Sequence, residues 1–155
     1  MNIAILTTKT IHHAFFVYQI KKKFDTTDVF LEKKKKFSKF KISHPIDQKI
    51  NIYEKKKCFK NSMSFLSKFK KNKEIKNFNS NMFLEKLKKK NYDLVIVFGA
   101  GIIGSKLINQ YKKKIFNLHG GDPQSYRGLD SLLWSIFNND FKKIVTTLHL
   151  LERKV

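Results

Sequence analysis

The run Leu94-Val95-Ile96-Val97-Phe98 constrains the fold more than any other part of this 155-residue chain. A short, unbroken run of mostly β-branched residues is typical of a parallel strand that is buried on both faces. Glycines at positions 99, 101 and 104 follow, then a helical segment through Tyr111 and a second apolar run at Ile115-Phe116. This order predicts a β-α-β unit with a right-handed crossover. We therefore expect an α/β protein with a Rossmann-like, three-layer open sheet of mostly parallel strands.

Further elements are expected on both sides of this unit. The predicted strands are Asn2 to Thr7, Val29 to Leu31, Ile50 to Tyr53 and Ile144 to Leu150, and a loop is predicted from Ile42 to Pro45. The predicted helices are Ile11 to about Lys23 (capped by Thr10), Met63 to Phe69, Asn81 to Lys90, and Ser131 to Phe137 (capped by Asp130).

Several side chains within these elements have a predicted setting. In the last helix, the apolar side is expected to consist of Leu132, Leu133, Ile136 and Phe137, with Trp134 also packed. The adjacent His12 and His13 diverge on a helix, so we expect surface or core histidines and no metal pair. His149 is expected to point to the surface of the sheet.

Asn117 and His119 form the candidate catalytic pair. They lie two residues apart at the end of a predicted strand, so both side chains should project from one face. A Gly-Gly-Asp-Pro turn follows at once, and ligands of open α/β sheets bind where strands end in this way. A polar strand end followed by an ordinary turn is the simpler alternative.

The longer motif resembles the folate-dependent formyltransferases, which act on methionyl-tRNA, glycinamide ribonucleotide or amino sugars. Asn117 and His119 match the strand-end pair of that family, and Arg127-Gly128 match the Arg-Gly that opens its next helix. One departure is local, because the family usually has its proline where this chain has Gln124. The resemblance covers roughly residues 92–155 and the opening strand.

This resemblance implies transfer of a formyl group from N10-formyltetrahydrofolate to the amine of an acceptor. It implies that Asn117 and His119 are catalytic and that Arg127 binds the substrate. It places the folate donor against two loops, which consist of Phe98, Gly99, Ala100, Gly101 and Ile102, and of Gly120, Gly121, Asp122, Pro123 and Gln124. The expected acceptor is a small amine that carries a phosphate, such as an amino sugar; Met-tRNA is a further possibility. No metal ligand is assigned.

The third catalytic residue of the family is an aspartate, and the alignment places it directly after Val155. Glu152 falls too early to replace it. We therefore expect residues 1–155 to form a single catalytic domain that is truncated at its C-terminal end. A severe loss of rate is expected without that aspartate.

The formal net charge of +21 is the basis for a second hypothesis, a basic nucleic-acid-binding module without catalysis. The lysines are scattered along the chain, however, and Arg127 and Arg153 are the only arginines. Base recognition and bidentate phosphate contacts favour arginine. We therefore favour solvated lysine faces, and nucleic acid remains an alternative partner.

The glycines from Gly99 to Gly104 are the basis for a third hypothesis, since they match the G-x-G-x-x-G of NAD-type dinucleotide-binding proteins. Asp122 lies at roughly the distance of the acid that binds the ribose. The motif does not follow the first strand, however, and Asp122 lies beyond a Gly-Gly break. Glycines with a structural role alone are a further alternative.

The cellular setting is expected to be the cytoplasm. Cys58 is the only cysteine, which excludes a disulfide framework and agrees with a reducing compartment. The first residues lack the basic segment of a signal peptide, and the apolar run from Leu94 to Ile103 is too short to cross a bilayer. We expect no membrane partner, and the oligomeric state is open.

Overall fold

A computed structural model describes residues 1–33, 45–60, 62–72, 74–128 and 130–152, with only the backbone for 45–48. The strands are β1 (Ile3–Thr7), β2 (Thr27–Glu32), β3 (Glu74–Ile75), β4 (Leu94–Phe98), β5 (Ile115–His119) and β6 (Thr147–Leu150). The helices are α1 (Ile11–Lys23), α2 (Pro45–Phe59), α3 (Met63–Lys71), α4 (Asn81–Lys90), α5 (Ser105–Gln110), α6 (Ser131–Phe137) and the 3-10 turn η1 (Phe141–Lys143).

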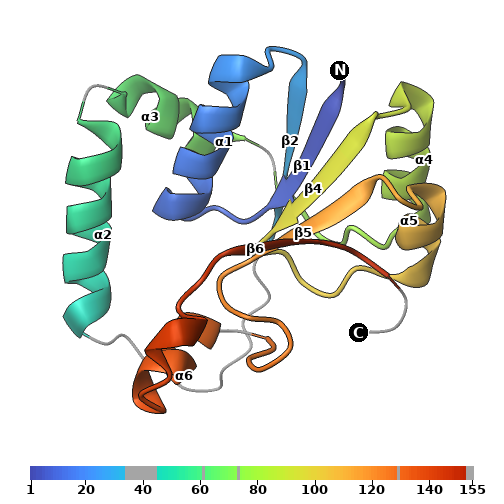
Figure 1. The fold of residues 1–155 in the computed structure, drawn as a ribbon. Coiled ribbons are helices and arrows are strands. Elements are labelled where there is room, and N and C mark those ends of the chain that lie inside the picture. Colours follow the sequence, from blue (N-terminus) through green and yellow to red (C-terminus); the bar gives the residue numbers. More distant parts are fainter. Residues whose placement is uncertain (34–44, 61, 73, 129, 153–155) are drawn as a thin grey trace.

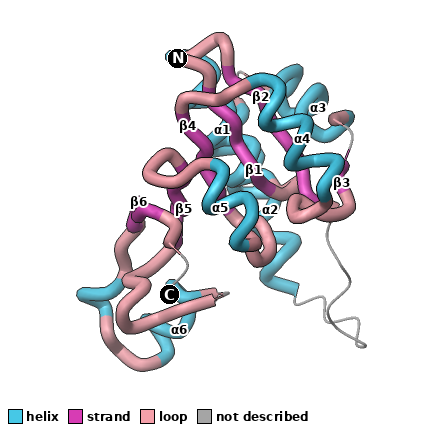
Figure 2. The backbone as a smooth tube through the Cα atoms, turned by 90° about the vertical axis from the view of Figure 1, so that its right-hand side faces the viewer, coloured by secondary structure: helices cyan, strands magenta, loops and turns pink. Residues whose placement is uncertain are grey.

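One six-stranded sheet organises the described chain, in the order β3-β2-β1-β4-β5-β6. The first five strands are parallel, and β6 runs antiparallel to β5 at the edge. Helices α1, α2 and α3 lie on one side of the sheet and α4 and α5 on the other (Figure 1). Figure 2 shows α4 and α5 in front of the strands, with α6 below the sheet beside β5 and β6. The predicted Rossmann-like, mostly parallel three-layer fold is confirmed.

Two apolar clusters hold these layers together, one on each face of β1 and β4. Alternate residues of β1 point to opposite faces, so Ala4 and Leu6 join the cluster under α4 and α5 while Ile3 and Ile5 join the cluster under α1. All five residues of β1 are buried. This is the pattern predicted from the continuous apolar runs, because a central parallel strand is covered on both faces.

The predicted strand from Ile50 to Tyr53 is wrong, because these residues lie in α2. Alternating apolar residues signal a strand only where one face is buried, and here Ile50, Ile52 and Tyr53 are all exposed. The helix instead begins at Pro45, a favoured first helical residue, and packs its end through Phe59. Of the predicted loop from Ile42 to Pro45, residues 42–44 lie outside the described residues.

The predicted packing of α6 is also wrong, although its bounds are confirmed. Its two buried residues are Ser131 and Ser135. The apolar residues predicted to face the core are exposed: Leu132, Leu133, Ile136 and Phe137, together with Trp134. Strand β6 is shorter than predicted, because η1 and three further residues occupy the segment from Phe141 to Thr146.

Candidate active site

The candidate site lies at the carboxyl edge of the parallel strands, where β4 and β5 end side by side. The two strands pair with Val97 beside Asn117 and Phe98 beside Leu118. The loop that follows Phe98 and the loop that follows His119 therefore start at the same edge of the sheet. Nine of the ten predicted folate contacts lie in these two loops, and the tenth, Phe98, is the last residue of β4. The fold therefore starts both sets at the same edge of the sheet.

Asn117 and His119 project from the same face of β5, as predicted, because they lie two residues apart in a regular strand. Both side chains are half-buried. In the antiparallel pair with β6, Asn117 lies opposite His149 and His119 opposite Thr147. The amide and the imidazole thus share a face with two polar side chains of the neighbouring strand.

The ring of His119 is held by the loop that follows it. Its Nε2 lies 2.9 Å from the carbonyl oxygen of Tyr126 and 3.1 Å from Oγ of Ser131. A carbonyl oxygen can only accept, so Nε2 carries a proton and donates it to Tyr126. Ligand contact at this histidine would therefore go through Nδ1.

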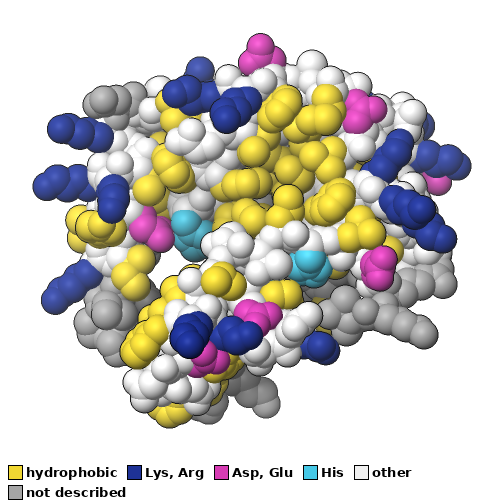
Figure 3. Space-filling model, in the orientation of Figure 1, with side chains coloured by type: hydrophobic (Ala, Val, Ile, Leu, Met, Phe, Trp, Pro, Cys, Tyr) yellow, Lys and Arg dark blue, Asp and Glu magenta, His cyan; other side chains and the backbone are white. Residues whose placement is uncertain are grey.

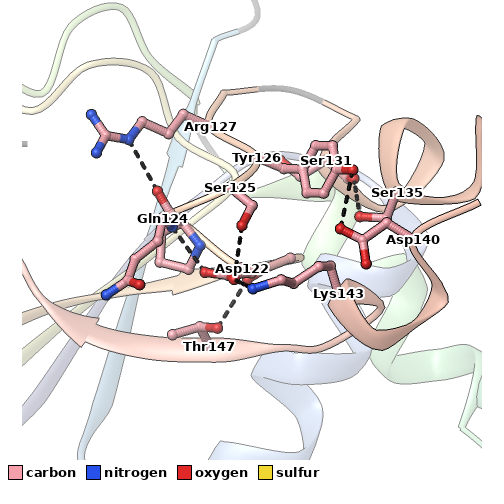
Figure 4. A network of polar contacts seen from close by, with 12 residues as sticks. Asp122, Gln124, Ser125, Tyr126, Arg127, Ser131, Ser135, Asp140, Lys143 and Thr147 are labelled. Carbon is pink, nitrogen blue, oxygen red and sulfur yellow. Dashed lines mark hydrogen bonds and ion pairs between the residues drawn. The ribbon is translucent and has the colours of Figure 1, made fainter. Parts of the chain in front are cut away.

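Asp122 anchors the loop between β5 and α6 (Figure 4). Its carboxylate accepts hydrogen bonds from the backbone N–H of Gln124 (2.9 Å) and from Oγ of Ser125 (3.1 Å), and it forms an ion pair with Lys143. The hydrogen bond from Lys143, followed by that from Gln124, lowers the pKa of Asp122 to about 2. Asp122 therefore shapes the loop as a carboxylate at neutral pH.

Arg127, the predicted substrate-binding residue, lies on the same loop. Its Nε donates to the carbonyl oxygen of Pro123 at 3.0 Å, and its side chain is exposed. In Figure 4 its guanidinium group points away from the network around Asp122. The residue is therefore fixed at one nitrogen and open to solvent at its end.

The loop after β4 is glycine-rich because other side chains pack against its backbone. Gly99 has φ +67°, and a Cβ atom there would lie 1.9 Å from Nε2 of His13. The two adjacent histidines of α1 have different surroundings. His13 is buried, whereas His12 is exposed and its Nδ1 lies 3.4 Å from a carboxylate oxygen of Glu54. Among the described residues, no cluster of three or more metal-binding side chains exists.

The same loop is unlike a cradle for a dinucleotide pyrophosphate. The backbone N–H of Gly101 donates to Oε2 of Glu32 at 2.6 Å, and that of Gly104 donates to Oδ1 of Asn79 at 2.7 Å. A pyrophosphate needs such N–H groups for itself and would be repelled by the Glu32 carboxylate. The Asp122 carboxylate is also engaged by Gln124, Ser125 and Lys143. The two contacts that the dinucleotide hypothesis requires, glycine N–H groups to the pyrophosphate and a carboxylate to the ribose, are therefore both occupied within the protein.

Three lysine blocks lie away from this site, whereas Arg127 and Lys143 belong to it. The three blocks end within four residues of the start of β2, β4 and β5, so they are at the opposite, amino-terminal edge of the sheet: Lys21–Lys23, Lys88–Lys90 and Lys112–Lys114. In Figure 3, lysines rim the molecule while apolar side chains gather over the middle of the visible face. No described helix is long and apolar enough to cross a membrane.

Four site residues were not singled out from the sequence: Glu32, Tyr126, Ser131 and Lys143. The contact of His149 with Asn117 was also missed, since His149 was expected at the sheet surface and lies half-buried beside Asn117. Its pairing depends on the register between β5 and β6, which an edge strand of four residues does not reveal in advance. Tyr126 acts through its carbonyl group, for which no side-chain pattern exists.

The sequence of the chain is similar to that of a known formyltransferase. The chain is 30% identical over 79 residues to a methionyl-tRNA formyltransferase of Finegoldia magna, and the match spans half of this chain and a quarter of that relative. No family model matches the chain.

Solved structures extend the similarity to the whole fold. A phosphoribosylglycinamide formyltransferase of Streptococcus pneumoniae has a TM-score of 0.61 at 17% identity, over 99% of this chain and 75% of that one. A 4-N formyltransferase of Francisella tularensis has a TM-score of 0.57 at 20% identity, over 99% of this chain and 52% of that one. The sequence similarity thus covers half of this chain, and the structural similarity covers 99% of it. The resemblance to the formyltransferase family is confirmed.

Proposed function

We propose that this protein transfers a formyl group from N10-formyltetrahydrofolate to the amine of a small acceptor. The observation that carries the proposal is the placement of Asn117 and His119 on one face of β5, beside the glycine-rich loop after β4. The comparisons support formyl transfer in general, and the donor and the acceptor are our inference.

The proposed reaction has a negatively charged tetrahedral intermediate. The acceptor amine attacks the formyl carbon, and the formyl oxygen gains charge as the carbon becomes tetrahedral. Asn117 would donate an amide N–H to that oxygen, and such a donor contributes about 3–4 kcal/mol in comparable sites. His119 would donate from Nδ1 when protonated and would help to move the proton from the amine to the leaving nitrogen of the folate.

The two loops are proposed to hold the donor. Phe98 to Ile102 would contact the pterin ring through backbone groups, and Gly120 to Gln124 would close the other side. The exposure of Gly99 supports this, because a ligand can reach its backbone. The N–H of Gly101 and the carbonyl of Ile102 already bond to Glu32 and Asn79. The exposed end of Arg127 would bind a phosphate of the acceptor, for which a guanidinium is well suited.

The acceptor is proposed to be an amino sugar or another small phosphorylated amine. Two structural relatives are named for phosphoribosylglycinamide or for a 4-N formyl transfer, and the sequence relative described above is named for methionyl-tRNA. Cys58 is half-buried and is the single cysteine of the chain, in agreement with a cytoplasmic protein.

A formyl-transfer assay tests the proposal. The 155-residue chain, and a longer form that supplies an aspartate directly after residue 155, are incubated with N10-formyltetrahydrofolate and a panel of amino sugars, glycinamide ribonucleotide and Met-tRNA. We expect a formylated product from the longer form and a much lower rate from the 155-residue chain. In the longer form, Asn117→Ala should lower kcat about 10²–10³-fold. Asn109→Ala, on the exposed side of α5, is the matched control and should behave as wild type. Absence of product from both forms with every acceptor would overturn the proposal.

Polyanion binding is a second candidate, favoured by the three lysine blocks at the amino-terminal edge of the sheet. It predicts that RNA binds with a steep dependence on salt, because each neutralised phosphate releases counterions. Binding that persists unchanged at high salt, or none at low salt, would exclude it. The lysine edge and the folate site lie at opposite ends of the strands, so each can be tested without the other.

A further inference from the structure

His149 faces the candidate catalytic amide across the β5–β6 pair. Its Nε2 lies 3.2 Å from Nδ2 of Asn117, and the two residues are direct partners in the antiparallel register. Both side chains are half-buried, so this hydrogen bond is partly shielded from water. The contact links a side chain proposed to meet the formyl oxygen with one that has no assigned role.

A second contact of the ring fixes where its proton lies. Nδ1 of His149 lies 3.1 Å from the carbonyl oxygen of Leu150. Because a carbonyl oxygen only accepts, Nδ1 must carry the proton, and in the neutral ring Nε2 is then a lone pair. That lone pair accepts from the NH2 group of Asn117, so the backbone of β6 determines which end of the amide faces the histidine.

The orientation of this amide decides what Asn117 can do. An asparagine amide has two N–H groups on one end and an oxygen on the other, and its terminal torsion is broad and roughly two-fold. With one N–H bonded to His149, the second N–H remains for a ligand and the amide oxygen is turned away. A reversed amide would present its oxygen to an oxygen that gains negative charge, and the two would repel.

We propose that His149 is a positioning residue that holds the Asn117 amide with an N–H toward the reacting formyl oxygen. This inference rests on the proposed formyl transfer for its functional consequence, whereas the amide–imidazole hydrogen bond can be tested without any substrate. If His149 only joined β6 to β5, phenylalanine and glutamine in its place should affect the rate equally. The backbone ladder already joins the two strands, and Thr147 Oγ1 donates to the carbonyl of Gly121 in the loop after β5.

The first experiment measures the proton position by NMR of the 15N-labelled chain at neutral pH. We expect the nitrogen shifts of His149 to report a neutral ring with the proton on Nδ1, and a through-hydrogen-bond coupling between its Nε2 and Nδ2 of Asn117. The coupling should vanish in Asn117→Ala while the ring keeps its proton on Nδ1. A ring with its proton on Nε2, or a doubly protonated ring, would overturn the proposal, whatever the activity of the protein.

The second experiment compares His149→Phe with His149→Gln in the formyl-transfer assay. Phenylalanine has a similar size but no acceptor, whereas the amide oxygen of glutamine can accept from Asn117. We expect kcat to fall about tenfold in the phenylalanine variant, less than the ~10²–10³-fold expected when a donor is removed outright. The KM for the folate should not change, and glutamine should restore most of the rate.

The outcomes separate this inference from the proposed function. If wild type transfers formyl groups and both variants match it, or both lose the same rate with raised KM, His149 has no positioning role. If wild type transfers nothing, the proposed function fails and the NMR result alone decides whether His149 orients the amide. Melting temperatures of both variants show whether any lost rate comes from lost folding.

Discussion

The half of the sheet around β1 and the region around α6 are stabilised in opposite ways. In β1 all five residues are buried, and the helices on both faces cover them with apolar side chains. In α6 the buried residues are two serines, and the five large apolar residues from Leu132 to Phe137 are exposed. Figure 3 shows apolar side chains at the surface over α6, at the bottom of the view. The first region is stabilised by removing apolar area from water, and the second mainly by polar contacts.

The polar contacts of the second region are those that form the candidate site. Ser131 contacts His119, and Ser135 donates to the carbonyl of Ser131. Asp122 and Lys143 tie the loop after β5 to η1. The first residue of α6 is thus buried against His119 of the candidate site, whereas the apolar residues of the helix do not face a core.

The largest expected difference between the regions is the effect of leucine truncation. Leu87 in α4 is fully buried, so Leu87→Ala should lower the free energy of unfolding by about 2–5 kcal/mol. Leu133 in α6 is 62% exposed, so Leu133→Ala should change it by less than about 0.5 kcal/mol. Urea unfolding of both variants measures the two values. Similar losses would mean that something covers α6 in solution.

Two glycines separate steric contact from backbone strain. Gly99→Ala should lower the free energy of unfolding by about 3 kcal/mol, because the new methyl group meets His13 at a positive φ. Gly128 in the site loop also has a positive φ (+90°) but nothing within 4 Å of a Cβ atom, so Gly128→Ala should cost only about 1 kcal/mol. Thermal unfolding of the pair provides the measurement. Equal costs would show that His13 can move aside.

The ion pair between Asp122 and Lys143, which lies in the site region, predicts that the free energy of unfolding depends on pH. The pKa of Asp122 is lowered from 3.8 to about 2, so its contribution to stability is present above about pH 4 and is lost as the pH falls toward 2. The same hydrogen bond raises the pKa of Lys143, so the contribution is also lost at alkaline pH above 10.5.

Urea unfolding between pH 2 and 5 tests this dependence. The stability of wild type should fall more steeply with acid than that of Asp122→Asn, whereas Asp25→Asn, which removes an exposed carboxylate at the other edge of the sheet, should retain the wild-type slope. The difference is expected to be small, since the pair is near the surface. Parallel curves for all three proteins would contradict it.

The smallest expected effect is a change in tryptophan fluorescence. Trp134 is the single tryptophan of the chain and is 54% exposed in α6, with Phe137 as its ring neighbour. Its fluorescence should resemble that of a tryptophan in water, be quenched readily by acrylamide, and shift little on unfolding. Trp134→Phe should leave stability within about 0.5 kcal/mol. A blue-shifted, protected emission would show that this surface is covered in solution.

Much of the first region could be predicted from local pattern, because its elements bury what their sequences make apolar. The run from Leu94 to Phe98 and the amphipathic helix from Asn81 to Lys90 both lie where they were expected. The prediction failed at Ile50 to Tyr53, where alternation occurs on an exposed helix, and in the packing of α6. In both places the apolar side chains do not face the core, so periodicity carries no information about it.

The sequence by itself determined the parallel sheet, the position of Asn117 and His119 at the end of one of its strands, and the resemblance to formyltransferases. Short-range spacing suffices for these features, since side chains two residues apart in a strand share a face. Only the tertiary structure decided that three lysine blocks meet at one edge, that Glu32 occupies the glycine loop, and that His149 faces Asn117. Each of these depends on which strands are neighbours and in what register. Glu32 and Gly101 lie 69 residues apart in the chain, and Asn117 and His149 lie 32 apart, so only the completed sheet brings them together.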